Sequence, residues 1–532
     1  MAQATSDESS IFYVSFVVPK FLVKQAKSNL ERKHKLDRSV KIQPYRRDAY
    51  INACGDHMLI QSTIILPDSM SQLEGRLQAL KELGLESYYD RIFIIKTHSR
   101  QASDVQQYDA QRNPLQEAFG KGLQQLPKEL LASLCLTMDR LLADLPDSYT
   151  IYPPMLLLTS KTFASSSWQT LLASASPRQL NDLYATVATA LRVTHIAQNA
   201  PIPPSIGQSL DRDPPASEQP LTKQPTTANI LRSPTGLKPL YGSFGPLTKT
   251  AQPTPHDLTT ALWVSTRQNN ILQTWAPVHT MFSRGNISEK TRLLTLPSIA
   301  QAVAEGEVAG AGSTAVDLYA GIGYFAFCYA RAGVRRVLCW ELNGWSVEGL
   351  RRGAAANGWG VRVVEGDGQG MEREEVDGTE EGEVFWVWRE SNERAGERIE
   401  RLRGAVPPIR HVNCGLLPSS RGSWETAVGA LDPGLGGWVH VHENIAMKEI
   451  EGKAAEILEE IQGIVDRVAD EDHRSQRDEL GGRKAILEHV QKVKTYAPGV
   501  MHCVLDIWIP PRRSLDEVKD SCKGSISLER EV

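Results

Sequence analysis

A strand–turn–helix–strand pattern over residues 316–343 limits the possible folds of this chain more than any other feature. The residues there read VDLYAGIGYFAFCYARAGVRRVLCWELN. They predict an apolar strand, a glycine turn, an amphipathic helix and a second apolar strand, over 314–319, 320–323, 324–332 and 337–340. Glycines in such a turn let the backbone approach a bound nucleotide closely. The pattern therefore predicts a βαβ unit with a nucleotide site, although an ordinary glycine turn of an α/β domain would look similar.

Acidic residues around this turn narrow the choice of ligand. Asp317 precedes Gly321 and Gly323 in the pattern D-x-x-x-G-x-G, and Glu341 ends the second strand. An acid about 20 residues after the turn can accept hydrogen bonds from both ribose hydroxyls. A dinucleotide usually needs a third glycine and a helix N-terminus for its pyrophosphate. The pattern therefore favours S-adenosylmethionine, with Asp367, after a predicted third strand, as a further contact.

The whole-chain composition excludes several classes of protein. At 532 residues the chain is long enough for more than one domain, and 41% hydrophobic with 23% charged residues is typical of globular proteins. A net charge of −4 creates no general attraction for nucleic acid, so RNA must be bound by local patches. The polar first ten residues are no signal peptide, and no apolar run is long enough to cross a membrane. We therefore expect a cytoplasmic protein.

Neither the cysteines nor the histidines predict a metal site. The seven cysteines are scattered and form no C-x-x-C pair, which argues against both a disulfide framework and zinc. Cys328, Cys339 and Cys414 lie among apolar residues and are expected in the core. His440 and His442 alternate along a predicted strand, a spacing that could bind metal, but no third ligand is signalled nearby. We expect structural histidines and no metal.

The first part of the chain predicts a small α+β domain over residues 1–198. A strand that enters a helix is expected at 11–22, further strands at 58–66 and 91–96, and a strand with a proline turn at 151–163. Helices are expected at 71–84, 114–145 and 178–197. Ten Lys or Arg residues lie between Lys20 and Arg47 against two acids, and Tyr45 among them could stack on a base. This patch is the best candidate for an RNA backbone, although a solvated helix face would look alike.

The second part predicts a Rossmann-like transferase domain over 258–512, followed by a tail, 513–532. Residues 199–257 hold about a dozen of the 30 prolines and are expected to be a flexible linker. Further strands are expected at 336–341, 360–365, 411–415, 437–442, 492–497 and 502–509. The turn Pro498–Gly499 suits a hairpin, so the last strand should be antiparallel, as in class I methyltransferases. The charged stretch 371–404 is expected to be a surface insertion.

Two loops are candidates for the chemistry. Ser283, Arg284 and Lys290 follow a predicted turn upstream of the first strand and could face the cofactor. The fourth strand of the predicted sheet ends in Asn413 and runs into a loop that contains Pro418. In a parallel sheet, ligands bind at the carboxyl ends of the strands. The alternative interpretation of the first loop is a simple entry turn onto the sheet. That of the second is a strand that ends at a proline.

Four strings together identify a family. WAP-x-x-TMFSRGNISEK (275–290), DLYAGIGYF (317–325), NCGLLPSS (413–420) and VK-x-YAP followed by H-x-VLD (493–506) resemble tRNA wybutosine-synthesizing protein 2. The resemblance covers most of 260–510. It implies transfer of the 3-amino-3-carboxypropyl group of S-adenosylmethionine to C7 of 4-demethylwyosine at position 37 of tRNA(Phe), with release of methylthioadenosine.

The same resemblance implies a set of cofactor contacts, a partner and a mechanism by orientation. The contacts match Ser283, Lys290, Glu341, Asp367 and the residue after it, where this chain has Gly368 instead of the usual Asn. The partner would be the anticodon loop of tRNA(Phe), with a monomeric enzyme favoured. No general base is apparent, and positioning residues are sought among Arg284, Asn413 and Pro418.

Two alternatives stay open at this point. The sister family of tRNA guanine-N1 methyltransferases, which act at position 37, shares the sheet but differs at MFSRGN and GLLPSS. A non-catalytic tRNA-binding scaffold would explain Gly368 and the long insertions, but it has no reason to keep the glycine turn and Glu341.

Overall fold

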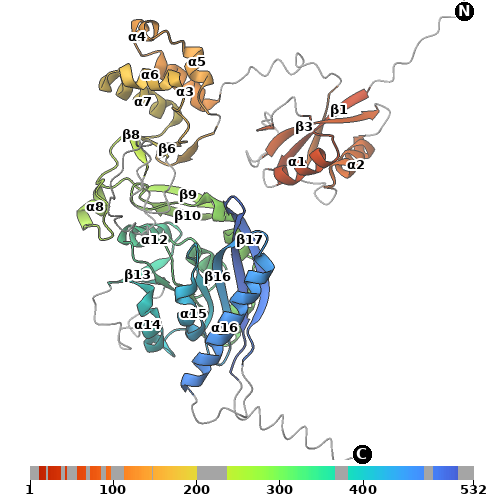
Figure 1. Ribbon diagram of the computed structural model, residues 1–532, viewed down its shortest axis with the longest axis vertical. Helices are drawn as coiled ribbons and strands as arrows, with labels where there is room; N and C mark the ends of the chain where they lie inside the picture. The colour runs from red at the N-terminus through yellow and green to blue at the C-terminus, as the bar shows by residue number, and fades with distance from the viewer. Residues whose placement is uncertain are drawn as a thin grey trace, which may run out of the picture. The chain divides into compact units, whose positions relative to one another are not determined.

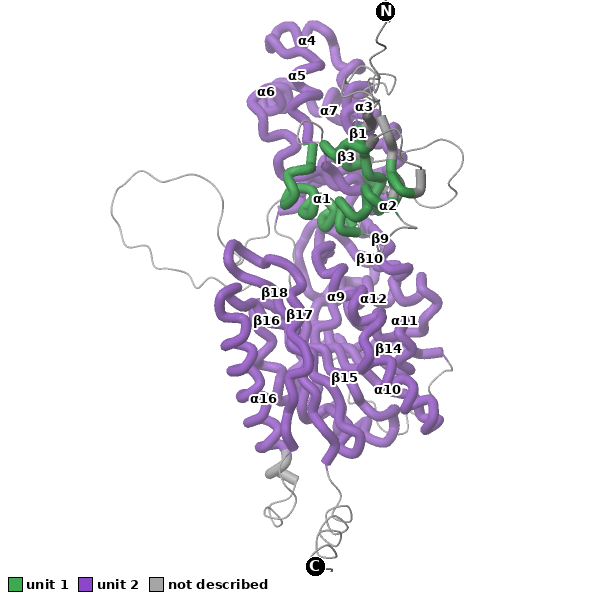
Figure 2. Tube along the Cα trace, turned by 90° about the vertical axis from the view of Figure 1, so that its right-hand side faces the viewer, with its two compact units in different colours: residues 1–111 green, residues 112–532 purple. Residues whose placement is uncertain are grey.

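The computed structural model describes residues 11–19, 22–37, 42–44, 57–67, 72–85, 92–97, 113–146, 148–199, 236–365, 382–472 and 483–512. The chain divides into two compact units, residues 1–111 and 112–532 (Figure 2). The sequence predicted a first domain that extends to residue 198. The structure groups residues 113–199 with the C-terminal unit, and their sheet is completed by a strand that lies inside the predicted linker.

The first unit is a small α+β fold. Its strands are β1 (Ile11–Pro19), β2 (Gln43–Pro44), β3 (His57–Pro67) and β4 (Phe93–Thr97), in the antiparallel order β2-β3-β1-β4. Its helices are α1 (Val23–Arg32) and α2 (Gln72–Leu83). Ala26 and Leu30 of α1 are buried in the core, whereas Lys24, Lys27 and Arg32 are exposed on the same helix. The basic stretch is thus in part the outer face of an amphipathic helix.

The second unit begins with a mainly helical part. Its helices are α3 (Pro114–Leu123), α4 (Lys128–Ser133), α5 (Met138–Ala143), α6 (Ser166–Ser174) and α7 (Pro177–Leu191). Its sheet has the order β5-β6-β7-β8, from β5 (Thr150–Tyr152), β6 (Met155–Leu158), β7 (His195–Gln198) and β8 (Lys238–Tyr241). The helix predicted over 114–145 is therefore three short helices, and that over 178–197 ends early. β8 lies within the predicted linker, and α8 (Pro255–Thr260) begins there and extends beyond its end.

A long sheet forms the body of the second unit. Its strands are β11 (Thr314–Asp317), β12 (Arg336–Trp340), β13 (Gly360–Glu365), β14 (Glu383–Arg389), β15 (Ile409–Cys414), β16 (Gly437–Ala446), β17 (Ile486–Ala497) and β18 (Val500–Ile509). Their order is β13-β14-β12-β11-β15-β16-β18-β17. The first six are parallel, and β18 runs antiparallel to β16 and β17. The predicted Rossmann-like sheet with a terminal antiparallel hairpin is confirmed.

Helices cover both faces of this sheet (Figure 1). One apolar cluster joins the strands to α14 (Ala395–Leu402), α15 (Trp424–Ala430) and α16 (Ile450–Asp472). The other joins them to α9 (Ile287–Leu293), α10 (Pro297–Val308), α11 (Ala326–Arg331) and α12 (Gly344–Ala356). The hairpin β9 (Val264–Gln268) and β10 (Ile271–Trp275) packs beside α12. Strands buried on both faces explain their continuous apolar runs.

The interpretation of 371–404 as a surface insertion is wrong for the residues that the structure describes. β14 lies inside the sheet between β13 and β12, and Phe385, Trp386, Val387 and Trp388 are buried. α14 then buries Ala395, Ile399 and Leu402 against the same core. The apolar run VFWVW within the charged stretch is the sequence signal of this strand. No helix among the described residues is long and apolar enough to span a membrane.

Candidate active site

The glycine turn between β11 and α11 adopts a conformation that requires glycine. Gly321 has φ of 55° and Gly323 has φ of 84°, both in the left-handed region. A Cβ on Gly323 would lie 2.5 Å from the ring of Phe327, closer than atoms can approach. The turn continues to residue 325, so α11 begins at Ala326, later than predicted. The open backbone is at the carboxyl edge of the parallel strands, where a ligand is expected.

Glu341 is attached to this turn by its carboxylate. One oxygen accepts the backbone N–H of Gly321 at 2.9 Å, and the other accepts that of Asn343 at 2.8 Å. Asn343 in turn caps α12 by accepting the N–H of Trp345. Burial raises the pKa of Glu341 to about 7, and these backbone hydrogen bonds oppose the rise. Each carboxylate oxygen keeps a further acceptor position, so the group can still receive ribose hydroxyls.

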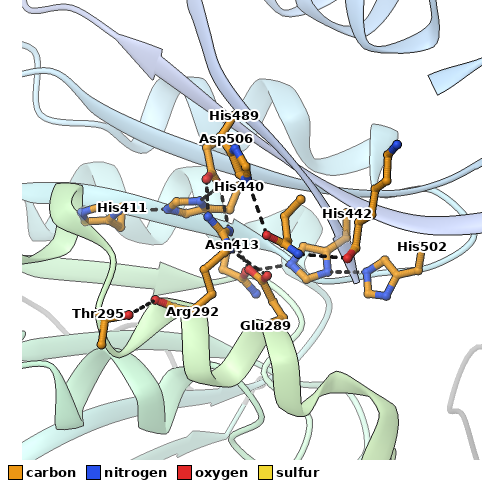
Figure 3. Close-up of polar contacts among 12 residues, drawn as sticks. Glu289, Arg292, Thr295, His411, Asn413, His440, His442, His489, His502 and Asp506 are labelled. Carbon is orange, nitrogen blue, oxygen red and sulfur yellow. Dashed lines mark hydrogen bonds and ion pairs between the residues drawn. The ribbon is translucent and has the colours of Figure 1, made fainter. Parts of the chain in front are cut away.

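Asp317 and Asn413 meet at the ends of the two central strands. Asp317 is fully buried, and its Oδ1 accepts the side-chain N–H of Asn413 at 3.1 Å and the backbone N–H of Tyr319 at 3.3 Å. Burial raises the pKa of Asp317 to about 6, and the hydrogen bond from Asn413 opposes the rise. The amide oxygen of Asn413 pairs with His442 Nε2 at 3.2 Å (Figure 3). Asn413 is therefore fixed in orientation from both sides.

Lys290 is a buried cation beside the turn. Only 3% of its surface is exposed, and its ammonium donates to Gln273 at 2.5 Å and to Gln268 at 3.1 Å. Gln273 itself donates to the carbonyl of Gly323 at 3.3 Å, which joins Lys290 to the glycine turn. Burial lowers the pKa of Lys290 to about 8, with repulsion from Lys494 as a smaller cause. Both partners are neutral amides, so the charge is solvated but not neutralised.

Ser283 is held on the same side of the turn. Its backbone N–H donates to the hydroxyl of Tyr324 at 3.2 Å, and that hydroxyl donates to the carbonyl of Met281. Its own hydroxyl accepts a hydrogen bond from Lys494 of β17 at 2.8 Å. The sequence prediction gave Lys494 no role, because its position 211 residues from Ser283 follows only from the sheet order.

The remaining predicted residues lie elsewhere. Arg284 is exposed, and its guanidinium donates to Thr150 of β5 at 2.6 Å, so it does not approach the glycine turn. Pro418 is exposed in the loop after β15, where its carbonyl accepts the N–H of Asn444 at 2.9 Å. Asp367 and Gly368 lie outside the described residues.

The strand next to β12 is β14, not the predicted third strand, β13. The segment that leaves β14 at the carboxyl edge is Glu390-Ser391-Asn392. Asn392 donates its side-chain N–H to the carbonyl of Leu318 at 3.0 Å, one residue after β11. The prediction looked for an Asn after β13 and found Gly368. The structure offers Asn392 at the edge beside the glycine turn, which local pattern reading missed because it placed a surface insertion there.

A second network of polar contacts joins His411, His440 and Asp506 next to Asn413 and His442 (Figure 3). His440 Nδ1 contacts Asp506 at 2.7 Å and His440 Nε2 contacts His411 at 3.0 Å, while Asp506 also pairs with Arg292. His440, Arg292 and their hydrogen bonds hold the pKa of Asp506 well below its usual range despite its burial. Both ring nitrogens of His440 thus have polar partners, and the described residues contain no group of three or more His, Cys, Asp or Glu that could hold a metal ion.

Comparison with known proteins relates the chain to one family, although no protein-family model matches it. It is 39% identical over 313 residues to tRNA wybutosine-synthesizing protein 2 of Schizosaccharomyces pombe, over 59% of this chain and 64% of that protein. It is 32% identical over 416 residues to the protein of the same name from Saccharomyces cerevisiae, over 71% of this chain and 77% of that protein. The chain belongs to the tRNA wybutosine-synthesizing protein 2 family.

Two solved structures are also similar to this chain, at low sequence identity. The Pyrococcus horikoshii TYW2 complex with MeSAdo aligns at TM-score 0.40 and 16% identity, over 72% of this chain and 97% of that one. The Methanocaldococcus jannaschii TYW2 complex with AdoMet aligns at TM-score 0.34 and 19% identity, over 52% and 91%. These TM-scores are too low to carry an argument, so the fold rests on the sheet order itself.

The residues of this family member fit S-adenosylmethionine. The left-handed glycine turn offers close backbone approach, Glu341 offers acceptors for ribose, and Lys290 offers a buried cation without an ion-pair partner among the described residues. A carboxylate is the natural counter-ion for such an ammonium.

Proposed function

We propose that this chain transfers the 3-amino-3-carboxypropyl group of S-adenosylmethionine to C7 of 4-demethylwyosine at position 37 of tRNA(Phe). The observation that carries this proposal is membership of the wybutosine-synthesizing protein 2 family, and it is supported by Glu341 and Lys290 beside the glycine turn. The co-substrate supplies an activated sulfonium. The bond between its sulfur and the γ-carbon breaks as the γ-carbon bonds to C7, and the sulfur leaves in neutral methylthioadenosine. The C7 proton of the base is lost in exchange.

Each end of the co-substrate has a candidate partner. Glu341 would accept the ribose hydroxyls, and the backbone at Gly321 and Gly323 would lie against the adenosine side. Lys290, with Ser283 beside it, would take the methionine carboxylate. Asn392, rather than Asp367 or Gly368, is the described side chain at the strand edge where the base-side contact was predicted.

The chain's own contribution to rate would be orientation. A sulfonium carries three carbons that a nucleophile can attack, and the one that faces the base decides which group is transferred. Holding the two ends of the co-substrate fixes that choice, and correct orientation can supply several kcal/mol of the barrier, about 7–11 at the most favourable. Asn413 is held in one orientation by hydrogen bonds to Asp317 and His442. It would form a rigid surface at the strand end that faces the reacting groups.

The tRNA would be held in part by the first unit. The outer face of α1 exposes Lys24, Lys27, Arg32 and, after its end, Lys33, which suits contacts to a phosphate backbone. We propose the anticodon loop of tRNA(Phe) as the substrate region and a monomer as the working form.

Mass spectrometry of the small-molecule product tests the function. The purified chain is incubated with S-adenosylmethionine and tRNA(Phe) that carries 4-demethylwyosine. Methylthioadenosine in equal amount to modified base supports the proposal. S-adenosylhomocysteine would instead make the chain a methyltransferase, and absence of both products with intact tRNA binding would favour a scaffold.

A further inference from the structure

Lys494 is a second cation at the candidate active site. It lies on β17, and its ammonium donates to the Ser283 hydroxyl at 2.8 Å. The residue before it also contacts helix α9, because the carbonyl of Val493 accepts a hydrogen bond from Ser288 at 3.4 Å. Lys494 is also close enough to Gly285 that a Cβ there would lie 2.7 Å from its Cδ. The hairpin β17–β18 thus contacts both the loop that carries Ser283 and the helix α9 that carries Lys290.

No acid neutralises this pair of lysines within the described part of the chain. Lys290 contacts two amide oxygens and Lys494 contacts a hydroxyl, and neither forms an ion pair with a described carboxylate. The rings of Phe282 and Tyr324 each lie 4.9 Å from the Lys290 ammonium, which stabilises a cation but does not cancel its charge. Both lysines have lowered pKa values because burial disfavours their charged forms.

Lys494 donates to the Ser283 hydroxyl, and Lys290 lies over the ring of Tyr324, whose own hydroxyl accepts the Ser283 N–H. The two ammonium groups are close enough to repel each other, so together they form a site for an anion. S-adenosylmethionine contains a single anionic group, the carboxylate of its methionine part, whereas its sulfonium and amino groups are cations. The lysines would therefore attract the carboxylate end and repel the sulfonium. Methylthioadenosine, the product that remains after transfer, has no carboxylate at all.

We propose that Lys494 binds the carboxylate of the aminocarboxypropyl group together with Lys290 and Ser283. This inference rests on the proposed function, since it assigns the part of the co-substrate that the site recognises. It gives the site a means to distinguish S-adenosylmethionine from methylthioadenosine, because the carboxylate that the lysines hold leaves with the transferred group. Glu341 would hold the ribose and the lysines would hold the carboxylate. The γ-carbon lies between these two groups, so its orientation toward the base would be fixed.

Calorimetric binding with the purified full chain tests the inference. Lys494→Met keeps the length of the side chain and removes the charge. We expect it to weaken S-adenosylmethionine binding by about 10- to 100-fold, the range for loss of a charged hydrogen bond. Binding of methylthioadenosine and of decarboxylated S-adenosylmethionine should stay within about twofold of wild type. Lys494→Arg should restore most of the lost affinity.

Lys492→Met is the matched control, because Lys492 is exposed on the same strand and should leave all three affinities unchanged. Equal weakening of all three ligands by Lys494→Met would mean a structural role and would overturn the inference. Unchanged S-adenosylmethionine affinity with weaker tRNA binding would overturn it in favour of a phosphate contact. Failure of the wild-type chain to bind S-adenosylmethionine at all would instead refute the proposed function.

Discussion

The side-chain amide of Asn413 donates to the carboxylate of Asp317 across 3.1 Å, and so joins the ends of the two central strands, β15 and β11. Asp317 cannot reach water, so this hydrogen bond supports its charged form. The oxygen of the same amide group forms a hydrogen bond with Nε2 of His442. The contact links the cofactor turn to the loop that is predicted to face the reacting base.

We predict that Asn413→Leu destabilises the protein by about 1–3 kcal/mol at pH 7, because it removes the side-chain donor to the buried Asp317 carboxylate and leaves it with backbone donors such as the N–H of Tyr319. The pKa of Asp317 is about 6, so the carboxyl is mostly neutral at pH 5 and needs that donor less. The loss in free energy of unfolding, measured with urea, should therefore be smaller at pH 5 than at pH 7. An equal loss at both values would contradict the account of this contact.

Replacement of Gly323 by alanine should abolish S-adenosylmethionine binding and lower the melting temperature. Its φ of 84° disfavours any side chain, and the added Cβ would strike the Phe327 ring. Gly358→Ala is the matched control, because Gly358 has φ of 81° but no atom within 4 Å of a new Cβ. The control should show the backbone strain alone, of order 1 kcal/mol, and normal cofactor binding. Similar effects of both substitutions would argue against a crowded turn.

Cofactor affinity should be greatest between about pH 7 and pH 8. In the free protein the pKa of Glu341 is about 7, so acidification below that value protonates the proposed ribose acceptor. The pKa of Lys290 is about 8, with Cys328 and Lys494 as its charged or titratable neighbours, so alkalinisation removes the proposed carboxylate partner. Binding should therefore release a proton below pH 7 and take one up above pH 8, which calorimetry in two buffers detects. Glu341→Gln should weaken binding and flatten only the acidic limb; an unchanged acidic limb would reject the ribose assignment.

Neutralisation of the α1 surface should weaken tRNA binding. Lys24, Lys27, Arg32 and Lys33 changed together to glutamine should lower the affinity and reduce the slope of log K against log salt by about 0.7–0.9 for each phosphate that these side chains neutralise in the wild type. A single variant, Lys24→Gln, is compared with Lys81→Gln on α2 of the same unit, which serves as its control. Filter binding at several salt concentrations measures both quantities. A quadruple variant with the wild-type slope would move the RNA site elsewhere.

Local sequence signals were sufficient for the parts of the site that lie close together in the chain. Gly321, Gly323 and Glu341 belong to one βαβ unit, so their spacing alone placed them at one edge. The buried Cys328, Cys339 and Cys414 and the antiparallel β17–β18 hairpin followed from apolar context and turn residues, and the structure confirms them.

The features that the sequence did not predict depend on pairing between strands that are far apart in the chain. β14 was missed because acidic and basic neighbours concealed a short apolar run whose burial depends on its place between β13 and β12. Lys494 and Asn392 reach the site from strands and loops that only the sheet order brings near. Local signals also did not show that β8, from the predicted linker, completes the sheet of β5 to β7.

A double-label transfer assay tests the central claim most directly. The co-substrate carries a carbon label in its carboxylate and tritium in its methyl group, and the acceptor is tRNA(Phe) with 4-demethylwyosine. The account predicts that the carbon label enters the tRNA while all tritium leaves in methylthioadenosine. Tritium in the tRNA, with the carbon label left in S-adenosylhomocysteine, would contradict it.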